Sequence, residues 1–386
     1  MAKIIYVWKG VYPWDVRVEK ICKALVKQGH QVHLLARCDY NQYPREYIDD
    51  YEVIRVGSNH KRFISTPISN NPMWRNAIKM AIEEIKPDLI IPREVMLAEV
   101  CSEFAHRKGI PVVMDMAENY PEVMRGWKQY QSKMYLRLLV HYLRYPDFVE
   151  RRSVGMMDGI ITVCSEQRDR LNKRFGFPYE KMQIVHNTPE LSWFEGARRG
   201  SSNPPTVFAY HGFINYERNL SNLIKGFVRA CKSVDNIKLV IAGKGEEYNE
   251  LLNQAKSSTA SEHIHFKGEY DQSDMKHLVG EMDIGILPYR INAHINNTIS
   301  NKLFDYLAVG KPVIVSQSPP MIRIMEETKS GIVVDCTSEK SIAEGIISVM
   351  NMNLDAMSRN GLKAAQEKYN WEVDSQVMVG FLNRFL

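Results

Sequence analysis

Short apolar runs alternate with amphipathic segments along almost the whole chain, and this alternation limits the possible folds more than any other feature. Near the start, the run Lys3 to Trp8 precedes an amphipathic stretch over residues 16–28, then Gly29 and a second apolar run, QVHLLAR. Continuous apolar runs are typical of strands buried on both faces, and apolar side chains with a 3.6-residue period indicate a helix. The order therefore predicts a parallel sheet covered by helices.

The alternation stops once and then starts again, which predicts two doubly wound α/β domains. The interruption is the segment 197–206, whose Gly, Ser and Pro content is typical of an exposed linker. A chain of 386 residues is long enough for two or three domains. We predict a first domain over 1–196, a linker over 197–206, a second domain over 207–370 and a terminal helix over 371–386. Since ligands gather at the carboxyl ends of parallel strands, a cleft between two facing domains is the expected site.

Composition removes several other classes of protein. The six cysteines are scattered, without a CxxC pair or a His cluster at metal-ligand spacing, which predicts reduced thiols in a cytoplasmic protein and no zinc site. No apolar run is long enough for a membrane-spanning helix, and the first is too short for a signal peptide. The net charge of +5 is too small to indicate nucleic-acid binding, but it is compatible with anionic small molecules or an anionic membrane.

A dehydrogenase is the first function that two such domains suggest, but its motif is missing. The loop after the first strand reads WKGVYPWD, and the one GxG, at Gly243 and Gly245, lacks a third glycine. The sequence also has no P-loop, and Ser165 does not lie in a GxSxG elbow.

The most informative segment is NNTISNKLFDYLAVGKPVIVS, over residues 296–316. It predicts a polar loop, a short helix with Ser300, Asn301 and Lys302 in its first turn, and a buried strand. A helix N-terminus suits a diphosphate, and Asp305 one turn later can accept hydrogen bonds from vicinal sugar hydroxyls. The alternative is that Asp305 is an ordinary solvated helix residue.

The same segment resembles the donor-binding stretch of retaining nucleotide-sugar glycosyltransferases of the GT-B fold, in glycosyltransferase family four. Further stretches match that family in order and spacing across nearly the whole chain, namely YPWDVRVEKICKALVKQGHQVHLLA, PVVMDMAENYPE, MDGIITVCSE, LVIAGKGEEYNELL and HIHFKGEYDQSDM. The resemblance implies the GT-B fold, with two Rossmann-like domains facing across a cleft. In this family an acidic residue at the position of Asp305 holds the ribose hydroxyls.

The resemblance also implies roles for other donor-binding residues. Arg218 matches a lysine that binds the diphosphate, and an arginine keeps that charge. An earlier cation of the family's pattern is Phe213 here, so Lys302 or Lys244 is expected to replace it. Gly10 matches a small residue that lets the backbone approach the donor phosphates. Gly268 and Tyr270 match the loop beside the base, where Tyr270 is either a stacking residue or an ordinary surface aromatic.

Two positions depart from the family at residues that normally touch the transferred sugar. Asn297 replaces a glutamate, and Ala117 replaces a histidine. Asn297 can still donate and accept hydrogen bonds, whereas the side chain of alanine cannot. We therefore predict Arg218, Asn297, Glu118 and Asp115 as the catalytic candidates.

The resemblance implies transfer of a hexose-type sugar from a nucleotide sugar to a glycan or lipid-linked acceptor, with retention, in cell-surface polysaccharide synthesis. No cofactor beyond the donor and no metal is expected. Two alternatives stay open, a nucleotide-sugar epimerase of GT-B shape and a catalytically weak sugar-nucleotide-binding protein.

The acceptor side is expected in the first domain. The stretch 127–152 interleaves basic and aromatic residues and predicts a long amphipathic helix. Such a helix can lie on an anionic membrane at the inner face of the cell membrane, where a lipid-linked acceptor would be found. The alternative is a domain helix with a buried stripe of Leu136, Leu139 and Leu143. Asp15 and Arg17, at the start of the first helix, are expected at the acceptor or at the domain interface.

Overall fold

The chain forms two compact units in the computed structural model, which describes residues 1–13, 15–39, 42–57, 68–197 and 205–386. Unit 1 comprises Met1–His186 with Ser375–Leu386, and unit 2 comprises Asn187–Asp374. Unit 2 thus begins before the predicted linker, of which residues 198–204 lie outside the described part. The physical reason is that residues after 187 pack on unit 2, where the Pro189 carbonyl accepts a hydrogen bond of 2.9 Å from the Trp371 amide.

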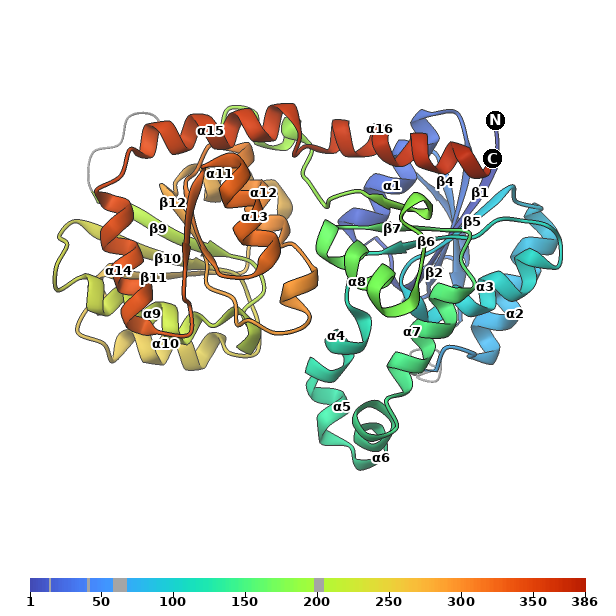
Figure 1. Cartoon of the computed structure of the whole chain (residues 1–386), viewed down its shortest axis with the longest axis horizontal. Coiled ribbons are helices and arrows are strands. Elements are labelled where there is room, and N and C mark those ends of the chain that lie inside the picture. Colours follow the sequence, from blue (N-terminus) through green and yellow to red (C-terminus); the bar gives the residue numbers. More distant parts are fainter. Residues whose placement is uncertain (14, 40–41, 58–67, 198–204) are drawn as a thin grey trace. The chain divides into compact units, whose positions relative to one another are not determined.

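Unit 1 contains two sheets that lie edge to edge (Figure 1). The larger has the order β3-β4-β2-β1-β5 and the smaller β6-β7-β8. Backbone bridges from Ile90 to Val112 and from Arg93 to Asp115 join β5 to β6. The strands are β1 (Lys3–Val11), β2 (Gln31–Arg37), β3 (Arg45–Ile48), β4 (Tyr51–Val56), β5 (Leu89–Pro92), β6 (Val113–Met116), β7 (Gly159–Thr162) and β8 (Met182–Ile184).

The strand pairs of unit 1 in the described ranges are parallel, as the alternation predicts, except where β3 runs antiparallel to β4. Strand β1 continues to Val11, although a loop was predicted from Lys9. Its register shifts between Trp8 and Val11, and Lys9 and Gly10 lie in that irregular segment at the carboxyl end of the strand.

Helices surround these sheets. The first begins after Asp15, whose side chain accepts hydrogen bonds from the amides of Arg17 and Val18 and thereby caps the helix. The helices of this unit are α1 (Val16–Lys27), α2 (Pro72–Ile85), α3 (Val95–His106), α4 (Tyr120–Gly126), α5 (Lys128–Ser132), α6 (Met134–Arg137), η2 (Leu138–Tyr142), α7 (Tyr145–Gly155), α8 (Ser165–Phe175), η3 (Tyr179–Lys181) and η8 (Asn383–Phe385).

The prediction of one long helix over 127–152 is wrong. The chain breaks between α5 and α6, forms a π-helical turn in η2, and takes a left-handed conformation at Arg144 (φ 51°) before α7, which has Pro146 in its first turn. The predicted buried stripe also fails at Leu143, which is 66% exposed. Helices α5 and α6 project away from the sheets of unit 1 (Figure 1).

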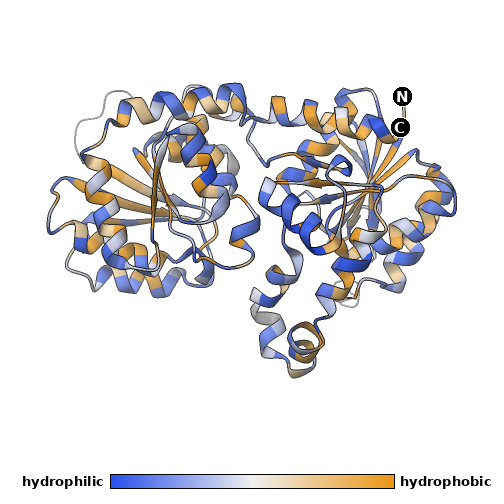
Figure 2. Cartoon of the chain, in the orientation of Figure 1, coloured by the Kyte–Doolittle hydropathy of each residue, from blue (hydrophilic) through white to orange (hydrophobic). Residues whose placement is uncertain are grey.

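Unit 2 is built on one parallel sheet of order β11-β10-β9-β12-β13-β14. Helices α9, α10 and α14 cover one face, and α12, α13 and α15 cover the other (Figure 1). The strands of both units are strongly apolar (Figure 2), as expected for strands between two helical layers. The strands are β9 (Thr206–His211), β10 (Ile237–Ala242), β11 (Ile264–Gly268), β12 (Ile284–Leu287), β13 (Val313–Ser316) and β14 (Gly331–Val334).

Among the described residues, unit 2 has one short helix before β9, and its other helices come after that strand along the chain. The helices of this unit are η4 (Leu191–Phe194), η5 (Tyr216–Arg218), α9 (Leu220–Ala230), α10 (Tyr248–Lys256), η6 (Ser261–His263), α11 (Gln272–Gly280), η7 (Ile295–Asn297), α12 (Asn301–Ala308), α13 (Pro319–Thr328), α14 (Glu339–Met350) and α15 (Leu354–Glu367). The last long helix, α16 (Trp371–Leu382), starts in unit 2, and its residues from Ser375 onward belong to unit 1. There Phe381 and Phe385 pack against Gly159, where a Cβ would lie 2.6 Å from the Phe385 ring.

Candidate functional site

Glycines bring the loops after β9, β10 and β11 into backbone contact. Gly243 has φ 137°, and a Cβ there would lie 1.8 Å from the carbonyl oxygen of Gly212. A Cβ at Gly245 would lie 1.8 Å from the carbonyl oxygen of Ile214. The Gly243 amide donates to the carbonyl of Gly268 at 2.6 Å. The GxG pair therefore serves a close packing of neighbouring loops, which explains why a third glycine is not needed.

His211, the last residue of β9, joins two of the predicted donor-binding residues. Its Nδ1 atom lies 2.9 Å from the Tyr270 hydroxyl, and its Nε2 atom lies 3.9 Å from Oδ2 of Asp305. Burial, and then the Lys302 ammonium, lower the pKa of His211 to about 3, so the imidazole is neutral. Because a tyrosine hydroxyl can donate or accept, the contact with Nδ1 is compatible with either neutral tautomer of His211. We call His211, Tyr270, Lys302 and Asp305 the donor cluster.

The N-terminus of α12 supplies the other predicted residues. Ser300 is its N-cap, and the Ser300 hydroxyl lies 2.7 Å from that of Tyr289. Asn301 and Lys302 form the first turn, and Asp305 is largely buried one turn later. The Lys302 side chain lies over Gly212, where a Cβ would be 2.0 Å from the lysine Cε atom. A helix start, a lysine and a carboxylate are thus held together at the carboxyl end of β9.

Arg218 is connected to this helix start through an aromatic ring that the sequence analysis did not single out. The guanidinium carbon lies 4.6 Å from the centre of the Tyr289 ring, an arrangement typical of a cation–π contact. Because Tyr289 also contacts Ser300, it links two predicted donor-binding residues.

Two predicted residues are engaged in local contacts. Lys244 forms an ion pair with Glu269, and both side chains are more than half exposed. The side-chain amide of Asn297 donates to the carbonyl of Ala293 at 2.7 Å within the short helix η7. Of the two cations expected to replace the one missing at Phe213, Lys302 is the one that joins the donor cluster.

Asp115 is enclosed in an ionic network inside unit 1. Its carboxylate accepts from Arg17 at 2.7 Å, from Arg93 at 2.9 Å and from the Tyr6 hydroxyl at 2.7 Å. Burial alone would raise the pKa of Asp115, but Arg17 and Arg93 outweigh it and lower the pKa to about 2. The Asp115 oxygens are thus engaged in holding the two arginines, and its catalytic role stays a prediction. Arg17, expected at the acceptor or an interface, is buried in the same network.

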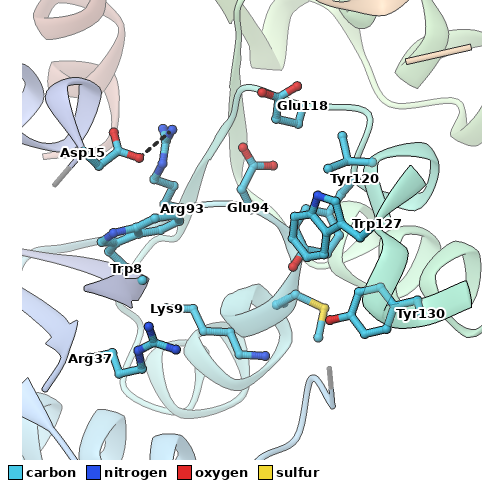
Figure 3. Close-up of a pocket in the computed structure, with 13 residues that line it drawn as sticks. Trp8, Lys9, Asp15, Arg37, Arg93, Glu94, Glu118, Tyr120, Trp127 and Tyr130 are labelled. Atoms are coloured by element: carbon cyan, nitrogen blue, oxygen red, sulfur yellow. Dashed lines mark ion pairs between the residues drawn. The ribbon is translucent and has the colours of Figure 1, made fainter. Parts of the chain in front are cut away.

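A cavity of about 540 Å³ opens in unit 1, at the carboxyl ends of β1 and β5 (Figure 3). We call it the unit-1 pocket. It contains the predicted residues Gly10, Glu118 and Asp15, and Asp15 pairs with Arg93 at 3.2 Å. At Gly10 a Cβ would lie 2.3 Å from the Trp8 indole, so this small residue makes room for the ring. The lining residues are Trp8, Lys9, Gly10, Asp15, Arg37, Arg93, Glu94, Met96, Glu118, Tyr120, Val123, Trp127 and Tyr130.

Glu94 is the pocket residue that the sequence analysis missed. Its backbone has φ 62°, a left-handed conformation that costs a residue other than glycine free energy and that is often found at functional sites. Its Oε1 atom accepts from the Ala117 amide at 3.0 Å, while Oε2 is buried without a hydrogen-bond partner among the described residues. Burial raises the pKa of Glu94 to about 8, although Arg93 lowers it. A carboxyl group thus stands beside Ala117, where the family has a histidine.

Comparison with known protein families gives this geometry its context. Residues 15–193 match the family described as Glycosyltransferase Family 4, and residues 193–368 match that described as Glycosyl transferases group 1. The chain belongs to the GT-B glycosyltransferases of the family-four type. The prediction of family and fold class is confirmed, and the enzyme uses a nucleotide sugar as its donor.

The matches to similar proteins cover most of this glycosyltransferase. A glycogen synthase of Mycobacterium tuberculosis is 21% identical, with 94% of this chain and 87% of the relative covered. An alpha-monoglucosyldiacylglycerol synthase of Streptococcus pneumoniae is 24% identical, with coverage of 90% and 78%. The structure of sucrose-phosphate synthase from Thermosynechococcus elongatus superposes with a TM-score of 0.78 at 14% identity, covering 100% of this chain and 99% of the other.

Three further observations concern membranes, metals and thiols. Among the helices in the described ranges, none is both long and apolar enough to cross a bilayer. Over the same ranges, no three His, Cys, Asp or Glu side chains gather in a way that could hold a metal ion. All six cysteines lie in described segments, and no disulfide joins any two of them.

Proposed function

We propose that this glycosyltransferase holds its nucleotide diphosphate sugar with the donor cluster and Arg218, and transfers the sugar with retention to a glycan or lipid-linked acceptor in cell-surface polysaccharide synthesis. The observation that carries the proposal is the contact of neutral His211 with both Tyr270 and Asp305, beside Lys302. It joins hydrogen-bond acceptors, an aromatic ring and a cation at one strand end, which is the chemistry that a nucleotide diphosphate requires.

The proposed donor-binding residues of unit 2 have separate chemical roles. Asp305 accepts hydrogen bonds from the ribose hydroxyls, and Tyr270 flanks the base. Lys302, Arg218 and the N-terminus of α12 stabilise the negative charge that develops on the departing diphosphate. Ser300 and Asn301 belong to that helix start, and Gly268 shapes the loop that carries Tyr270. Because these cations can balance the charge, we propose that turnover needs no metal ion and no further cofactor.

The unit-1 pocket is the proposed acceptor site. Trp8, Trp127 and Tyr130 line it, and aromatic faces of this kind pack against sugar rings. Glu94 and Glu118 add carboxyl groups that can bind hydroxyls. In this proposal Glu118 remains a catalytic candidate, while Gly10 keeps its expected role of close approach to the donor. Asn297 keeps its expected contact with the transferred sugar through its side-chain oxygen.

The segment 127–145 supports an acceptor that lies on a membrane. It contains no Asp or Glu, and its basic residues include Lys133 and Arg137, both exposed. Large apolar side chains on it are also more than half exposed, namely Met134, Tyr135, Leu138, Tyr142 and Leu143. We call these five side chains the exposed patch. Apolar side chains among basic ones are typical of segments that bind anionic membranes. In this proposal the enzyme works in the cytoplasm, at the inner face of the cell membrane.

A thermal-shift screen of the full chain against nucleotides and nucleotide sugars tests the proposed function. A preferred donor should raise the melting temperature in proportion to its affinity, because it binds the folded state. The selected donor is then incubated with and without lipid-linked and soluble glycan acceptors. Acceptor-dependent transfer with retained anomeric configuration supports the proposal. Epimerised sugar in donor-only incubations would favour the epimerase, and tight donor binding without turnover would favour a binding protein.

A further inference from the structure

Two basic side chains reach the unit-1 pocket from neighbouring strands. Lys9 lies in the irregular segment of β1, and Arg37 is the last residue of β2, paired in register with Val11. Both line the cavity, and Figure 3 shows them on the side opposite Glu94 and Glu118. The pocket thus has one side that carries carboxyl groups and one side that carries cations.

Arg93 and Arg37, which both line the pocket, differ in how their charge is balanced. Arg93 pairs with Asp15 at 3.2 Å and with Asp115 at 2.9 Å. Within the described part of the chain, Arg37 makes no ion pair and no side-chain hydrogen bond. Burial lowers the pKa of Lys9 to about 8, and the nearby positive charge of Arg37 contributes to that shift. Two cations placed together in a partly buried cavity are an arrangement that an anion stabilises.

We propose that Lys9 and Arg37 form an anion subsite, which holds a phosphate or carboxylate group of the acceptor sugar while Glu94 and Glu118 face its hydroxyls. The inference rests on the proposed function only in treating the bound sugar as the acceptor. A volume of about 540 Å³ lies within the range of about 300–1,000 Å³ that is common for small-molecule sites. An arginine beside a lysine suits either anion, because the guanidinium fork binds two oxygens at once.

Calorimetry on the full chain tests the subsite with three probes that differ only at carbon 6 of glucose. These are glucose 6-phosphate, glucuronate and glucose. We expect at least one anionic probe to bind roughly tenfold or more tightly than glucose, because charge-assisted hydrogen bonds are the strong ones. Tight binding of glucose 6-phosphate alone identifies a phosphorylated acceptor, and tight binding of glucuronate alone identifies an acidic sugar.

Variants then assign the effect to the two side chains. Arg37→Gln and Lys9→Gln should each lower the affinity for the anionic probe at least about tenfold and leave the affinity for glucose unchanged. Lys27→Gln is the matched control, since Lys27 is an exposed lysine at the end of α1 and does not line the pocket. The proposal is overturned if neither anionic probe binds better than glucose, or if both variants bind the anionic probe like the unchanged protein.

A separate titration distinguishes this inference from the proposed function. Affinity for the nucleotide sugar found in the screen should be the same in Arg37→Gln and in the unchanged protein, because the donor cluster lies in unit 2. If no nucleotide sugar binds, the proposed function fails while the anionic probes still report on the subsite. Loss of donor affinity in Arg37→Gln, with the anionic probe unaffected, would overturn the assignment of Arg37 to an acceptor anion.

Discussion

The Nε2 atom of His211 lies 3.9 Å from Oδ2 of Asp305, although the two residues belong to distant segments of the sequence. The contact is made because β9 ends next to the first turns of α12, with the Tyr306 ring packed edge-on against His211 at 5.2 Å. At this separation the two side chains form no hydrogen bond, and the Asp305 carboxylate lies beside a neutral rather than a charged imidazole.

Replacing Asp305 by Ala should weaken nucleotide binding about tenfold to a hundredfold. The variant removes hydrogen bonds from the ribose to a charged acceptor, and each such bond is worth about 1.5–3 kcal/mol. Calorimetry with the nucleotide identified in the screen measures the change. Asp274→Ala, at an exposed carboxylate on α11, is the matched control and should bind normally. Normal affinity in Asp305→Ala would remove this residue from the donor site.

His211 should make the protein less stable at acidic pH. Its pKa is about 3 in the folded state and about 6.5 when unfolded, so the unfolded state binds more protons between these values. The contribution of neutral His211 to stability is therefore lost as the pH falls from about 6.5 toward 3. Melting temperatures from pH 4 to 7 should fall less steeply for His211→Asn than for the unchanged protein. An unaltered slope would contradict the buried, neutral state, and His263→Asn, at an exposed histidine, should keep the original slope.

The contribution of Glu94 to stability should change with pH in the opposite direction. Its pKa is about 8 in the folded state against about 4.3 unfolded, so the folded state binds more protons in this interval. Stability contributed by the protonated carboxyl is therefore lost as the pH rises from about 4.3 to 8. Glu94→Gln keeps the hydrogen bond to the Ala117 amide, and its melting temperature should fall less steeply as the pH rises. The control is Glu83→Gln, at an exposed position of α2. If Glu94→Gln melts like the unchanged protein at every pH, Glu94 is not buried as described.

The exposed patch should bind anionic vesicles. Replacing Tyr135, Leu138 and Tyr142 together by Ser should reduce sedimentation with phosphatidylglycerol vesicles at least about tenfold, because these side chains supply the apolar contact. Binding of the unchanged protein should weaken at high salt, since the basic residues of the segment are screened. Tyr47→Ser, at an exposed tyrosine of β3, is the control and should sediment normally. Equal sedimentation of the triple variant and the unchanged protein would rule out the patch as the membrane contact.

The alternation of apolar runs was sufficient to predict the fold because it reports burial directly. Strand β5 and helix α10 have the bounds that the pattern predicts, Leu89–Pro92 and Tyr248–Lys256. Strands β3 and β4 were not predicted, since their apolar residues alternate with polar ones over short lengths. The helical stretch after Trp127 was predicted as continuous because the periodicity of apolar residues does not reveal backbone conformation. Arg144 has a left-handed conformation and interrupts the helix before α7 begins at Tyr145.

The candidate site was predictable where a residue lies inside a recognisable motif, as Lys302 and Asp305 do. Three other residues of the candidate sites could not be predicted from a motif. His211 and Tyr289 act through rings and hydroxyls at the ends of separate strands, and Glu94 acts through a backbone conformation that its sequence does not reveal. One signal was present, because Arg93 and Glu94 directly follow the buried strand LIIP, where ligand-binding residues of parallel sheets gather.

Sugar transfer by the unchanged protein and by Arg218→Ala, measured by mass spectrometry of the acceptor product, tests the proposed donor site most directly. Arg218 packs on Tyr289, and we assign it to the charge of the departing diphosphate. Removing such a group typically costs about a hundredfold to a thousandfold in turnover. We expect donor-dependent product in the unchanged protein, also with a chelator present, and turnover reduced at least about a hundredfold in Arg218→Ala. Undiminished transfer by Arg218→Ala, or no consumption of any nucleotide sugar by the unchanged protein, would contradict the proposed donor site.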